Sequence, residues 1–343
     1  MTPKEFREIT ELLATPKNIV VVPHKNADGD AIGSSLAMYH YLTGKNHRVK
    51  VVSPNEYPEF LKWLPGTDKV LKFDKQNGQS KRAIAKADII FLMDFNDLSR
   101  VGDDMQKTLE AYPGIFVMID HHQQPSDVAR YLFSDTSICA TAQMVYHFLE
   151  NCNEIASITK EMATCLYTGI LTDTGSFRFP STTPTTFRIA ANLIEKGADN
   201  AQIYNNIYDT NSYGRLQLLG QALQNLKVLP EYHCAYITIS DAEKKKFNFQ
   251  KGDTEGVVNY ALSIKDIIFG VIFIEDKEQG IIKISFRSKG KFSVNQFARN
   301  HFEGGGHDNA AGGKSPLSME ETLHKFFALL PRYKESLKNS NEI

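Results

Sequence analysis

The sequence predicts an α/β protein with a mostly parallel sheet in its N-terminal domain and a smaller α+β domain at its C-terminal end. Two observations favour this fold. Near-continuous apolar runs alternate with helical patterns through the first half, which is typical of parallel strands covered by helices on both faces. In the second half, a short loop that contains glycine separates two apolar runs, which indicates a hairpin. A length of 343 residues is consistent with about two domains.

The first half is organised as alternating strands and helices. Residues 1–18 mix charges with apolar positions, which predicts an amphipathic surface helix rather than a secretory signal. The apolar run at 18–23 predicts a buried strand, and the helical pattern that follows it spans 31–42 and stops near Gly44. The later elements continue the alternation, with strands at 49–53, 88–94 and 114–120 and helices at 141–149 and 159–170.

The second half has a different order of elements. A helical region at 185–226 contains Gly197, Gly214 and Gly220 and predicts a connector. We expect strands at 233–240, 267–275 and 281–287, a hairpin loop at 276–280, helices at 254–262 and 294–301, and a frayed tail at 334–343. The expected domains are therefore 1–190, a helical connector at 191–228, and 229–343.

Composition excludes several classes of protein. Hydrophobic residues make up 42% of the chain and charged residues 23%, which supports a sizeable core and excludes wholesale disorder. The formal net charge of -1 argues against a protein that coats long nucleic acid, because such binding needs a basic excess. No run approaches the roughly 18 apolar residues of a membrane span. The four cysteines show no C-x-x-C pair, which indicates buried, reduced thiols and a cytoplasmic protein.

Acidic residues and histidines gather where the predicted strands end. His24, Asp28 and Asp30 follow the first strand, and Asp94 ends a later one. The loops at the carboxyl ends of parallel strands share one edge of the sheet, where ligands bind. We therefore expect these side chains to converge with the remaining members of the set, which are Asp120, His121, His122 and Asp173.

Four converging carboxylates repel one another unless cations lie among them. Two divalent metals would cancel the charge of four aspartates. Mixed carboxylate and imidazole ligands suit Mn²⁺, Co²⁺, Fe²⁺ or Zn²⁺, whereas an all-oxygen site would suit Mg²⁺ or Ca²⁺ better. Two metals about 3.5–4 Å apart commonly hold a phosphoryl group and generate a hydroxide nucleophile.

Simpler interpretations exist for single residues. Asp30 precedes a predicted helix and could serve only as its N-cap, and a lone His121 or His122 could be an ordinary surface histidine. Arg287 could be a solvated cation at a strand end, and residues 304–306 a flexible turn. These interpretations do not explain why acidic residues follow several segment ends at once.

The motifs resemble those of the DHH phosphoesterases. Residues 24–34, His-Lys-Asn-Ala-Asp-Gly-Asp-Ala-Ile-Gly-Ser, are similar to the first motif of that family, and Asp94 to the second. The triplet at 120–122 is the one that names the family, and Asp173 is similar to the fourth motif. Residues 304–312, Gly-Gly-Gly-His-Asp-Asn-Ala-Ala-Gly, and the preceding Arg287-Ser288 resemble the associated DHHA1 domain. The resemblance spans about 18–330, with departures at Ala27 and Glu303 that affect no proposed ligand.

The resemblance implies how the residues divide their roles. One metal would take His24, Asp28 and Asp94, and the other Asp30, Asp94, His121 and Asp173, so that Asp94 bridges the two. Asp120 would orient His121, and His122 would face the substrate phosphate. In the second domain, Arg287 and His307 would hold phosphate or base, with the active site in the cleft between the domains. The substrate-contacting set implied in this way is Ser34, Arg287, Gly304, Gly305, Gly306 and His307.

Within the family the chain is similar to the bacterial nanoRNases. This similarity implies hydrolysis of RNA of a few nucleotides to mononucleotides, and dephosphorylation of 3′-phosphoadenosine-5′-phosphate, by a hydroxide bridging two divalent metals. Mn²⁺ is expected ahead of Mg²⁺ or Co²⁺. Phosphodiesterase action on cyclic di-AMP or its linear product, hydrolysis of pyrophosphate or short polyphosphate, and a non-catalytic nucleotide sensor stay open as alternatives. We expect no long nucleic acid or membrane partner, and a homodimer is the commonest assembly for such a chain.

Overall fold

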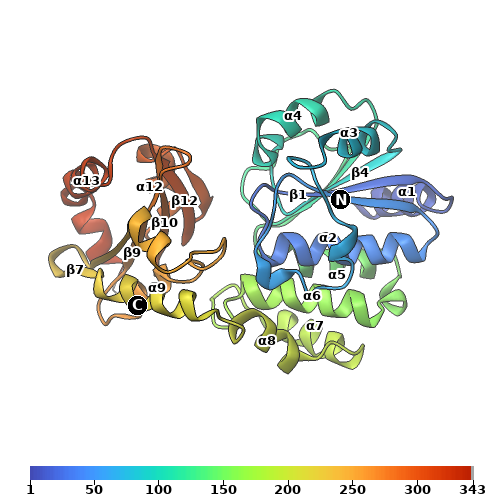
Figure 1. Cartoon of the computed structure of the whole chain (residues 1–343). Helices are drawn as coiled ribbons and strands as arrows, with labels where there is room; N and C mark the ends of the chain where they lie inside the picture. The colour runs from blue at the N-terminus through green and yellow to red at the C-terminus, as the bar shows by residue number, and fades with distance from the viewer. Residues whose placement is uncertain (341–343) are drawn as a thin grey trace. The chain divides into compact units, whose positions relative to one another are not determined.

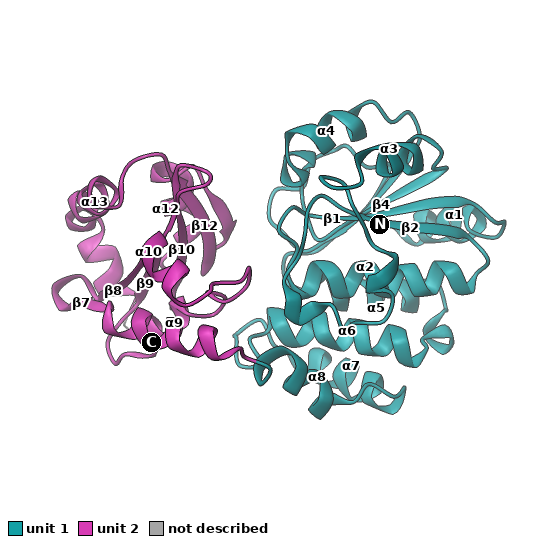
Figure 2. Cartoon of the chain, in the orientation of Figure 1, with its two compact units in different colours: residues 1–210 teal, residues 211–343 magenta. Residues whose placement is uncertain are grey.

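The structure is a computed structural model that describes residues 1–340, and the chain divides into two compact units (Figures 1 and 2). The first unit is Met1–Thr210 and the second is Asn211–Ile343. The connector expected at 191–228 spans this boundary. Within the described part of the chain, no helix is both long and apolar enough to cross a lipid bilayer.

A parallel sheet forms the centre of the first unit, in the strand order β3-β2-β1-β4-β5-β6. The predicted parallel sheet is therefore confirmed, although two short edge strands were not expected. The chain runs outward from β1 in one direction and then returns to β4 on its other side. Ligands of open parallel sheets bind at such a reversal. The strands are β1 (Asn18–Pro23), β2 (Arg48–Ser53), β3 (Leu71–Lys72), β4 (Ile89–Met93), β5 (Ile115–Asp120) and β6 (Tyr131–Ser134).

Helices cover both faces of this sheet, as Figure 1 shows, with α2, α5 and α6 on one side and α3 and α4 on the other. The strands that face them are apolar along their length, and all five residues of β4 are buried. This explains why these strands lack an alternating polar pattern. The helices of the unit are α1 (Pro3–Leu12), α2 (Gly29–Gly44), α3 (Asn77–Ala85), α4 (Asp103–Glu110), α5 (Thr141–Asn151), α6 (Lys160–Asp173), α7 (Pro184–Glu195) and α8 (Asn200–Tyr208).

Helices α2 and α6 approach each other closely through glycine. A Cβ atom added at Gly33 would lie 2.5 Å from the carbonyl oxygen of Cys165, and one added at Gly29 would lie 2.5 Å from Oγ1 of Thr172. Only glycine leaves room for backbones at this separation. The contact places the start of α2 beside the end of α6, so that the two helix ends that carry acidic residues lie together.

The second unit contains a mixed sheet in the order β11-β12-β10-β9-β8-β7. The expected hairpin is confirmed, because β9 and β10 pair antiparallel on either side of the loop that follows Asp276. Strands β8 and β9 are parallel, whereas the other pairs are antiparallel. The strands are β7 (Lys227–Leu229), β8 (Cys234–Ile239), β9 (Phe269–Asp276), β10 (Ile281–Ser288), β11 (Gly305–His307) and β12 (Ala310–Ser315).

The alternative interpretation of residues 304–306 as a flexible turn is not supported, because Gly305 and Gly306 belong to β11. Two expectations for this unit also need correction. The helix expected at 254–262 begins only at Val258, after a series of turns. The frayed tail is wrong for residues 334–339, which continue α13 and bury Leu337 completely, while 341–343 lie outside the described residues. The helices are α9 (Tyr213–Gln224), α10 (Asp241–Lys246), α11 (Val258–Ser263), α12 (Val294–His301) and α13 (Met319–Asn339).

Candidate metal centre and substrate-contacting residues

The turn between β1 and α2 supplies three polar side chains of the predicted site. Asp28 is the N-cap of α2, and its Oδ1 accepts hydrogen bonds from the backbone N–H groups of Asp30 and Ala31. Asp30 lies within the first turn of the helix and is buried. The N-cap alternative considered for Asp30 therefore applies to Asp28, which leaves the Asp30 carboxylate available to the site.

Asp94 lies at the centre of the cluster, directly after β4. Its Oδ2 is 3.5 Å from Nε2 of His24, and its Oδ1 is 3.6 Å from Nε2 of His121. The carboxylate is almost completely buried, and the residue has a φ of 65°. Aspartate is one of the residues that adopt this left-handed region more readily than most, and here it turns the chain sharply after the strand. Asp94 thus presents one oxygen to each of two histidines.

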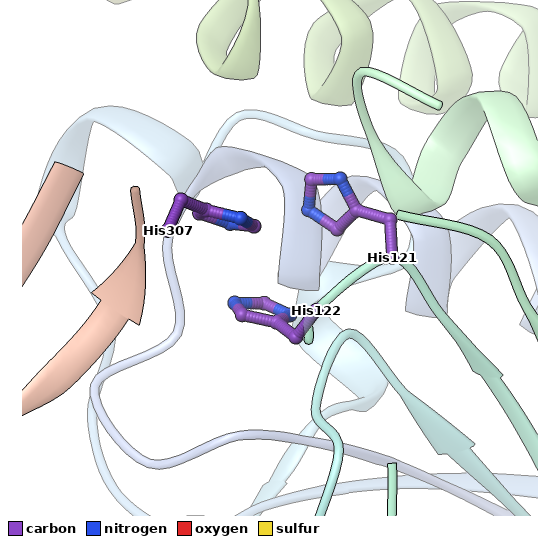
Figure 3. A group of neighbouring side chains, drawn as sticks. All are labelled: His121, His122 and His307. Atoms are coloured by element: carbon purple, nitrogen blue, oxygen red, sulfur yellow. The ribbon is translucent and has the colours of Figure 1, made fainter. Parts of the chain in front are cut away.

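The two histidines of the triplet at the end of β5 have different hydrogen-bond partners. The ring of His121 places Nδ1 3.0 Å from the carbonyl oxygen of Ile138, whereas Oδ1 of Asp120 accepts a hydrogen bond of 2.7 Å from Nδ1 of His122. The two imidazole rings meet edge to face at 5.0 Å between centroids (Figure 3). The expectation that Asp120 orients His121 is therefore wrong: a backbone carbonyl takes that position, and Asp120 orients His122 instead.

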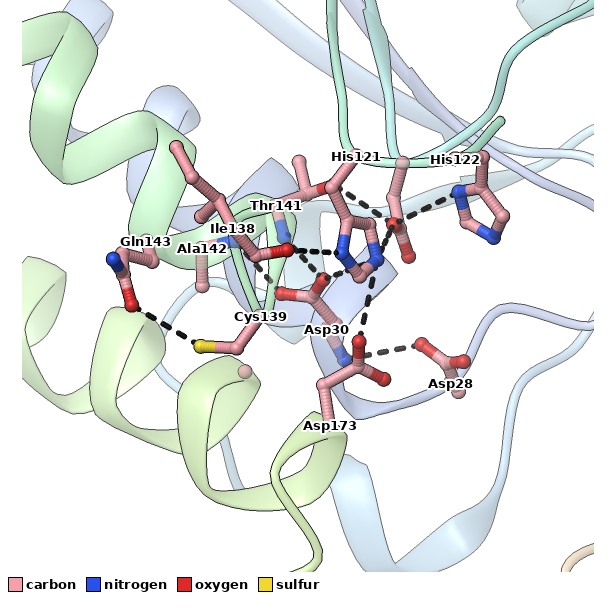
Figure 4. Close-up of polar contacts among 12 residues, drawn as sticks. Asp28, Asp30, His121, His122, Ile138, Cys139, Thr141, Ala142, Gln143 and Asp173 are labelled. Carbon is pink, nitrogen blue, oxygen red and sulfur yellow. Dashed lines mark hydrogen bonds and ion pairs between the residues drawn. The ribbon is translucent and has the colours of Figure 1, made fainter. Parts of the chain in front are cut away.

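Asp173 closes the cluster from the last turn of α6. Its Oδ2 lies 3.2 Å from Nε2 of His121 (Figure 4). The sequence predicted a helix at 159–170, and α6 extends three residues further and ends at Asp173. Close packing of α6 on α2 brings Asp173 to the same edge of the sheet as the three residues after β1.

The first turn of α5 is a part of the site that the sequence did not predict. The backbone N–H groups of Thr141 and Ala142 donate to Oδ2 and Oδ1 of Asp30, at 2.6 and 2.8 Å (Figure 4). The hydroxyl of Thr141 also donates to Oδ1 of Asp94, at 2.8 Å. The sequence placed a helix start at Thr141, but nothing local showed which carboxylate would meet it.

Crowding of these acids shifts their pKa values. Burial raises the pKa of Asp173 to about 7, and the neighbouring charges of Asp28 and Asp94 add to that effect. Burial, with the charges of Asp94 and Asp173, also raises the pKa of Asp30. Burial would raise the pKa of Asp94 as well, but the hydrogen bond from His24 and the charges of the three histidines outweigh it and lower that pKa. The site therefore concentrates negative charge that the protein alone compensates poorly.

The donor set fits divalent cations. The donor atoms of His24, Asp28 and Asp94 lie within 4.8 Å of one another, and so do those of Asp30, Asp94 and His121. Within residues 1–340, the ion-pair partners of the four aspartates are histidines, and no lysine or arginine pairs with them. Such mixed oxygen and imidazole donors suit first-row divalent metals.

The second unit places Arg287 and His307 on one face of its sheet. Arg287 of β10 and His307 of β11 both lie opposite Ala310 of the intervening strand β12, so their side chains share a face. Phe286, the neighbour of Arg287, points to the opposite face and is buried in the core. The sheet register therefore brings these two predicted residues within about two strand spacings of each other.

Backbone packing explains two of the three glycines before His307. A Cβ at Gly304 would collide with the carbonyl oxygen of Gly312, and one at Gly306 would lie 2.5 Å from the carbonyl oxygen of Ala310. Gly306 also has a φ of 150°, and its N–H donates to Oδ1 of Asn295, a residue that the sequence did not single out. Close approach of β12 is thus sufficient reason for Gly304 and Gly306, whereas a Cβ atom at Gly305 would make only ordinary contacts with the side chains of Arg299 and Asn295.

Ser34 does not fit the role that the resemblance implied. Its side chain is fully buried in α2, and its hydroxyl donates to the carbonyl oxygen of Ala31 at 3.3 Å. A substrate has no accessible surface to contact there. We therefore remove Ser34 from the substrate-contacting set.

Comparison with known proteins gives a consistent result. The DHH family N-terminal domain matches residues 18–170, and the DHHA1 domain matches residues 231–334. The bifunctional oligoribonuclease and PAP phosphatase NrnA of Thermus thermophilus is 30% identical over 311 residues, which cover 90% of this chain and 88% of that protein. The protein of the same name from Bacillus subtilis is 29% identical over 88% of this chain and 92% of its own length.

A solved structure is also similar along nearly the whole chain. An exopolyphosphatase-related protein from Bacteroides fragilis has a TM-score of 0.93 and 41% sequence identity, with 98% of each chain covered. The two-domain fold of this chain is therefore shared with a protein determined by crystallography.

Proposed function

The chain belongs to the DHH family of phosphoesterases, and on this basis we propose that it hydrolyses short oligoribonucleotides to mononucleotides and removes phosphate from 3′-phosphoadenosine-5′-phosphate. The relatives that are about 30% identical over most of the chain carry these two activities in their names. Both substrates are phosphoric esters of ribonucleotides, so one metal-assisted reaction serves for both.

The position of Asp94 is the observation that carries this proposal. The buried Asp94 carboxylate directs Oδ2 toward His24 and Oδ1 toward His121. Asp28 also lies near His24, and Asp30 and Asp173 also lie near His121. We assign one metal to His24, Asp28 and Asp94, and a second metal to Asp30, Asp94, His121 and Asp173. Two divalent ions held in this way supply charge neutralisation at a phosphoryl group and a water of lowered pKa. We expect Mn²⁺ to be the physiological ion, ahead of Mg²⁺ or Co²⁺.

The remaining residues position the substrate. Because Asp120 accepts a hydrogen bond from Nδ1 of His122, the opposite ring nitrogen of His122 is directed away from Asp120, and we propose that it contacts a phosphate oxygen when substrate binds. In the second unit, Arg287 offers a planar guanidinium, which suits the paired oxygens of a phosphate. His307 lies on the same face of that sheet and serves as a second contact to phosphate or base.

The charge of the chain favours a short substrate. A nuclease that tracks along long RNA needs a basic groove with stacking aromatic residues, and its affinity depends on many phosphate contacts. A net charge of -1 does not supply such a surface. We therefore propose a substrate of a few nucleotides. We also propose that the protein acts in the cytoplasm and forms homodimers.

A turnover panel tests the proposal. Purified protein with Mn²⁺ is incubated with a diribonucleotide, a long single-stranded RNA, 3′-phosphoadenosine-5′-phosphate, cyclic di-AMP and pyrophosphate. Fast turnover of the dinucleotide and the bisphosphate, with slow turnover of the long RNA, is the expected result. EDTA and the Asp94→Ala variant should each abolish it, since both remove the shared metal position.

Other results would replace the proposal with a named alternative. Preference for cyclic di-AMP would assign the site to that phosphodiester, and preference for pyrophosphate would assign it to phosphoanhydrides. Tight nucleotide binding without any product would indicate a sensor. Full activity of Asp94→Ala would exclude the shared-carboxylate mechanism itself.

A further inference from the structure

Thr141 is the one residue of the described chain whose backbone and side chain contact different acids of the metal centre. Its N–H donates to Oδ2 of Asp30 at 2.6 Å, and its hydroxyl donates to Oδ1 of Asp94 at 2.8 Å. The side chain is fully buried. A hydroxyl has a single hydrogen and can donate only one hydrogen bond. Here the acceptor is the carboxylate that the two proposed metals share.

The contact falls on the acid whose orientation matters most. Asp94 is held at a φ of 65°, and its two oxygens face different histidines, so a rotation of the carboxylate would misdirect both oxygens at once. The hydroxyl of Thr141 donates directly to one of these oxygens, and its β-branched side chain has few rotamers, so the contact restricts that rotation.

The same turn also fixes the neighbouring acid. Ala142 donates its N–H to Oδ1 of Asp30 at 2.8 Å, so the first turn of α5 contacts both oxygens of Asp30. Helix N-termini favour negative charge through their free N–H groups. Because Ile138, three residues before Thr141, accepts the hydrogen bond from His121, the short segment 138–142 contacts three of the proposed ligands.

We propose that Thr141 is a positioning residue of the metal centre, whose hydroxyl fixes the Asp94 carboxylate in the orientation that serves both metals. The proposal rests on the proposed function only for the identity of the metal ligands. It predicts that loss of the hydroxyl weakens metal binding before it affects substrate binding. Groups that orient metal ligands commonly contribute about 10–100-fold in affinity or activity.

The test compares variants that differ only in the hydroxyl. Thr141→Val keeps the shape and the backbone N–H but cannot donate from its side chain, whereas Thr141→Ser keeps the donor. Thr168→Val is the matched control, because Thr168 is also a fully buried helical threonine and its hydroxyl donates to the carbonyl oxygen of Thr164 in its own helix. Mn²⁺ affinity is measured by electron paramagnetic resonance of the free ion, and unfolding in EDTA is followed by circular dichroism.

We expect Thr141→Val to bind Mn²⁺ about 10–100-fold more weakly than the parent protein, in line with other groups that orient ligands. Thr141→Ser and Thr168→Val should bind Mn²⁺ with nearly the parent affinity. In turnover assays, the Mn²⁺ concentration for half activation should rise with the same factor for Thr141→Val, while KM for the dinucleotide stays nearly unchanged.

Two results would overturn the proposal: parent-like Mn²⁺ affinity in folded Thr141→Val, or an equal loss in Thr141→Val and Thr168→Val. If Thr141→Val does not fold, Thr141→Ala, which fits the same space without a donor, takes its place with the same expected loss. The outcome is separable from the proposed function. A parent protein that binds Mn²⁺ but hydrolyses no member of the substrate panel would refute that function, and the affinity comparison would still decide the role of Thr141.

Discussion

Oδ1 of Asp120 accepts a hydrogen bond of 2.7 Å from Nδ1 of His122, while the histidine between them in the sequence turns to the carbonyl oxygen of Ile138. The two consecutive histidines therefore have different roles, and Asp120 orients the second of them. His121 directs Nε2 toward Asp94 and Asp173, in the metal centre. Asp120 is fully buried, its Oδ2 has no hydrogen-bond partner within the described residues, and its other oxygen holds His122.

This relationship predicts that Asp120 acts on turnover rather than on metal affinity. Asp120→Asn keeps the size of the side chain but removes the charge that fixes the ring of His122. We expect kcat to fall about 10–100-fold, as is usual when such an orienting partner is lost. Mn²⁺ affinity, measured by calorimetry, should stay close to that of the parent protein. An Asp120→Asn protein that folds but loses Mn²⁺ would instead place Asp120 among the groups that support the metals.

Metal binding should release protons at low pH. In the metal-free protein, the raised pKa of Asp173, about 7, and the raised pKa values of His24 and His121 keep these groups largely protonated at pH 6. Mn²⁺ ligation requires the unprotonated forms, so binding must expel these protons.

The number of released protons should therefore fall between pH 6 and pH 8.5, and the apparent Mn²⁺ affinity should rise over the same interval. Calorimetry in two buffers of different ionisation enthalpy measures the proton count at each pH. Heats that do not depend on the buffer at pH 6 would contradict the raised pKa values.

The glycine contact between α2 and α6 gives a prediction of stability. Gly33→Ala would force its new methyl group against the carbonyl oxygen of Cys165, which is backbone and cannot move aside. Overpacking of this kind costs typically about 1–3 kcal/mol in the free energy of unfolding. Gly44→Ala, at the end of the same helix, meets nothing within 4 Å and should be neutral or stabilising by up to about 1 kcal/mol. Urea unfolding of both variants checks the difference, and equal stabilities would show that the helices separate easily.

The cysteines should be unreactive while the protein is folded. All four are free and buried, and burial raises the pKa of Cys139 to about 12. Since the thiolate is the reactive form, alkylation of the folded protein at pH 8 should be at least about 100-fold slower than that of a free thiol. Mass spectrometry after iodoacetamide treatment measures this, with urea-unfolded protein as the control that takes four labels. A cysteine that reacts rapidly in the folded protein would identify a segment that opens to solvent.

The sequence alone determined the type of fold and most of the metal-centre candidates. Apolar strands that end in acidic residues are a local pattern, and parallel topology necessarily brings their carboxyl ends to one edge. For this reason the residue order is sufficient to predict that His24, Asp30 and Asp94 meet at one place, whereas Asp173 reaches it through the packing of α6 on α2. Burial of the four cysteines followed from the same local evidence.

Only the tertiary structure determined the hydrogen-bond partner of each side chain in the site. Asp120 reaches His122 rather than His121 because β5 ends at that residue, and the loop before α5 brings the Ile138 carbonyl to the other ring. Likewise, Thr141 meets Asp94 although 47 residues separate them. Glycines 304 and 306 make room for β12, and Ser34 is buried within α2, so neither role could be read from the residue types. Hydrogen-bond partners are set by the packing of whole helices and strands, and local residue patterns do not encode that packing.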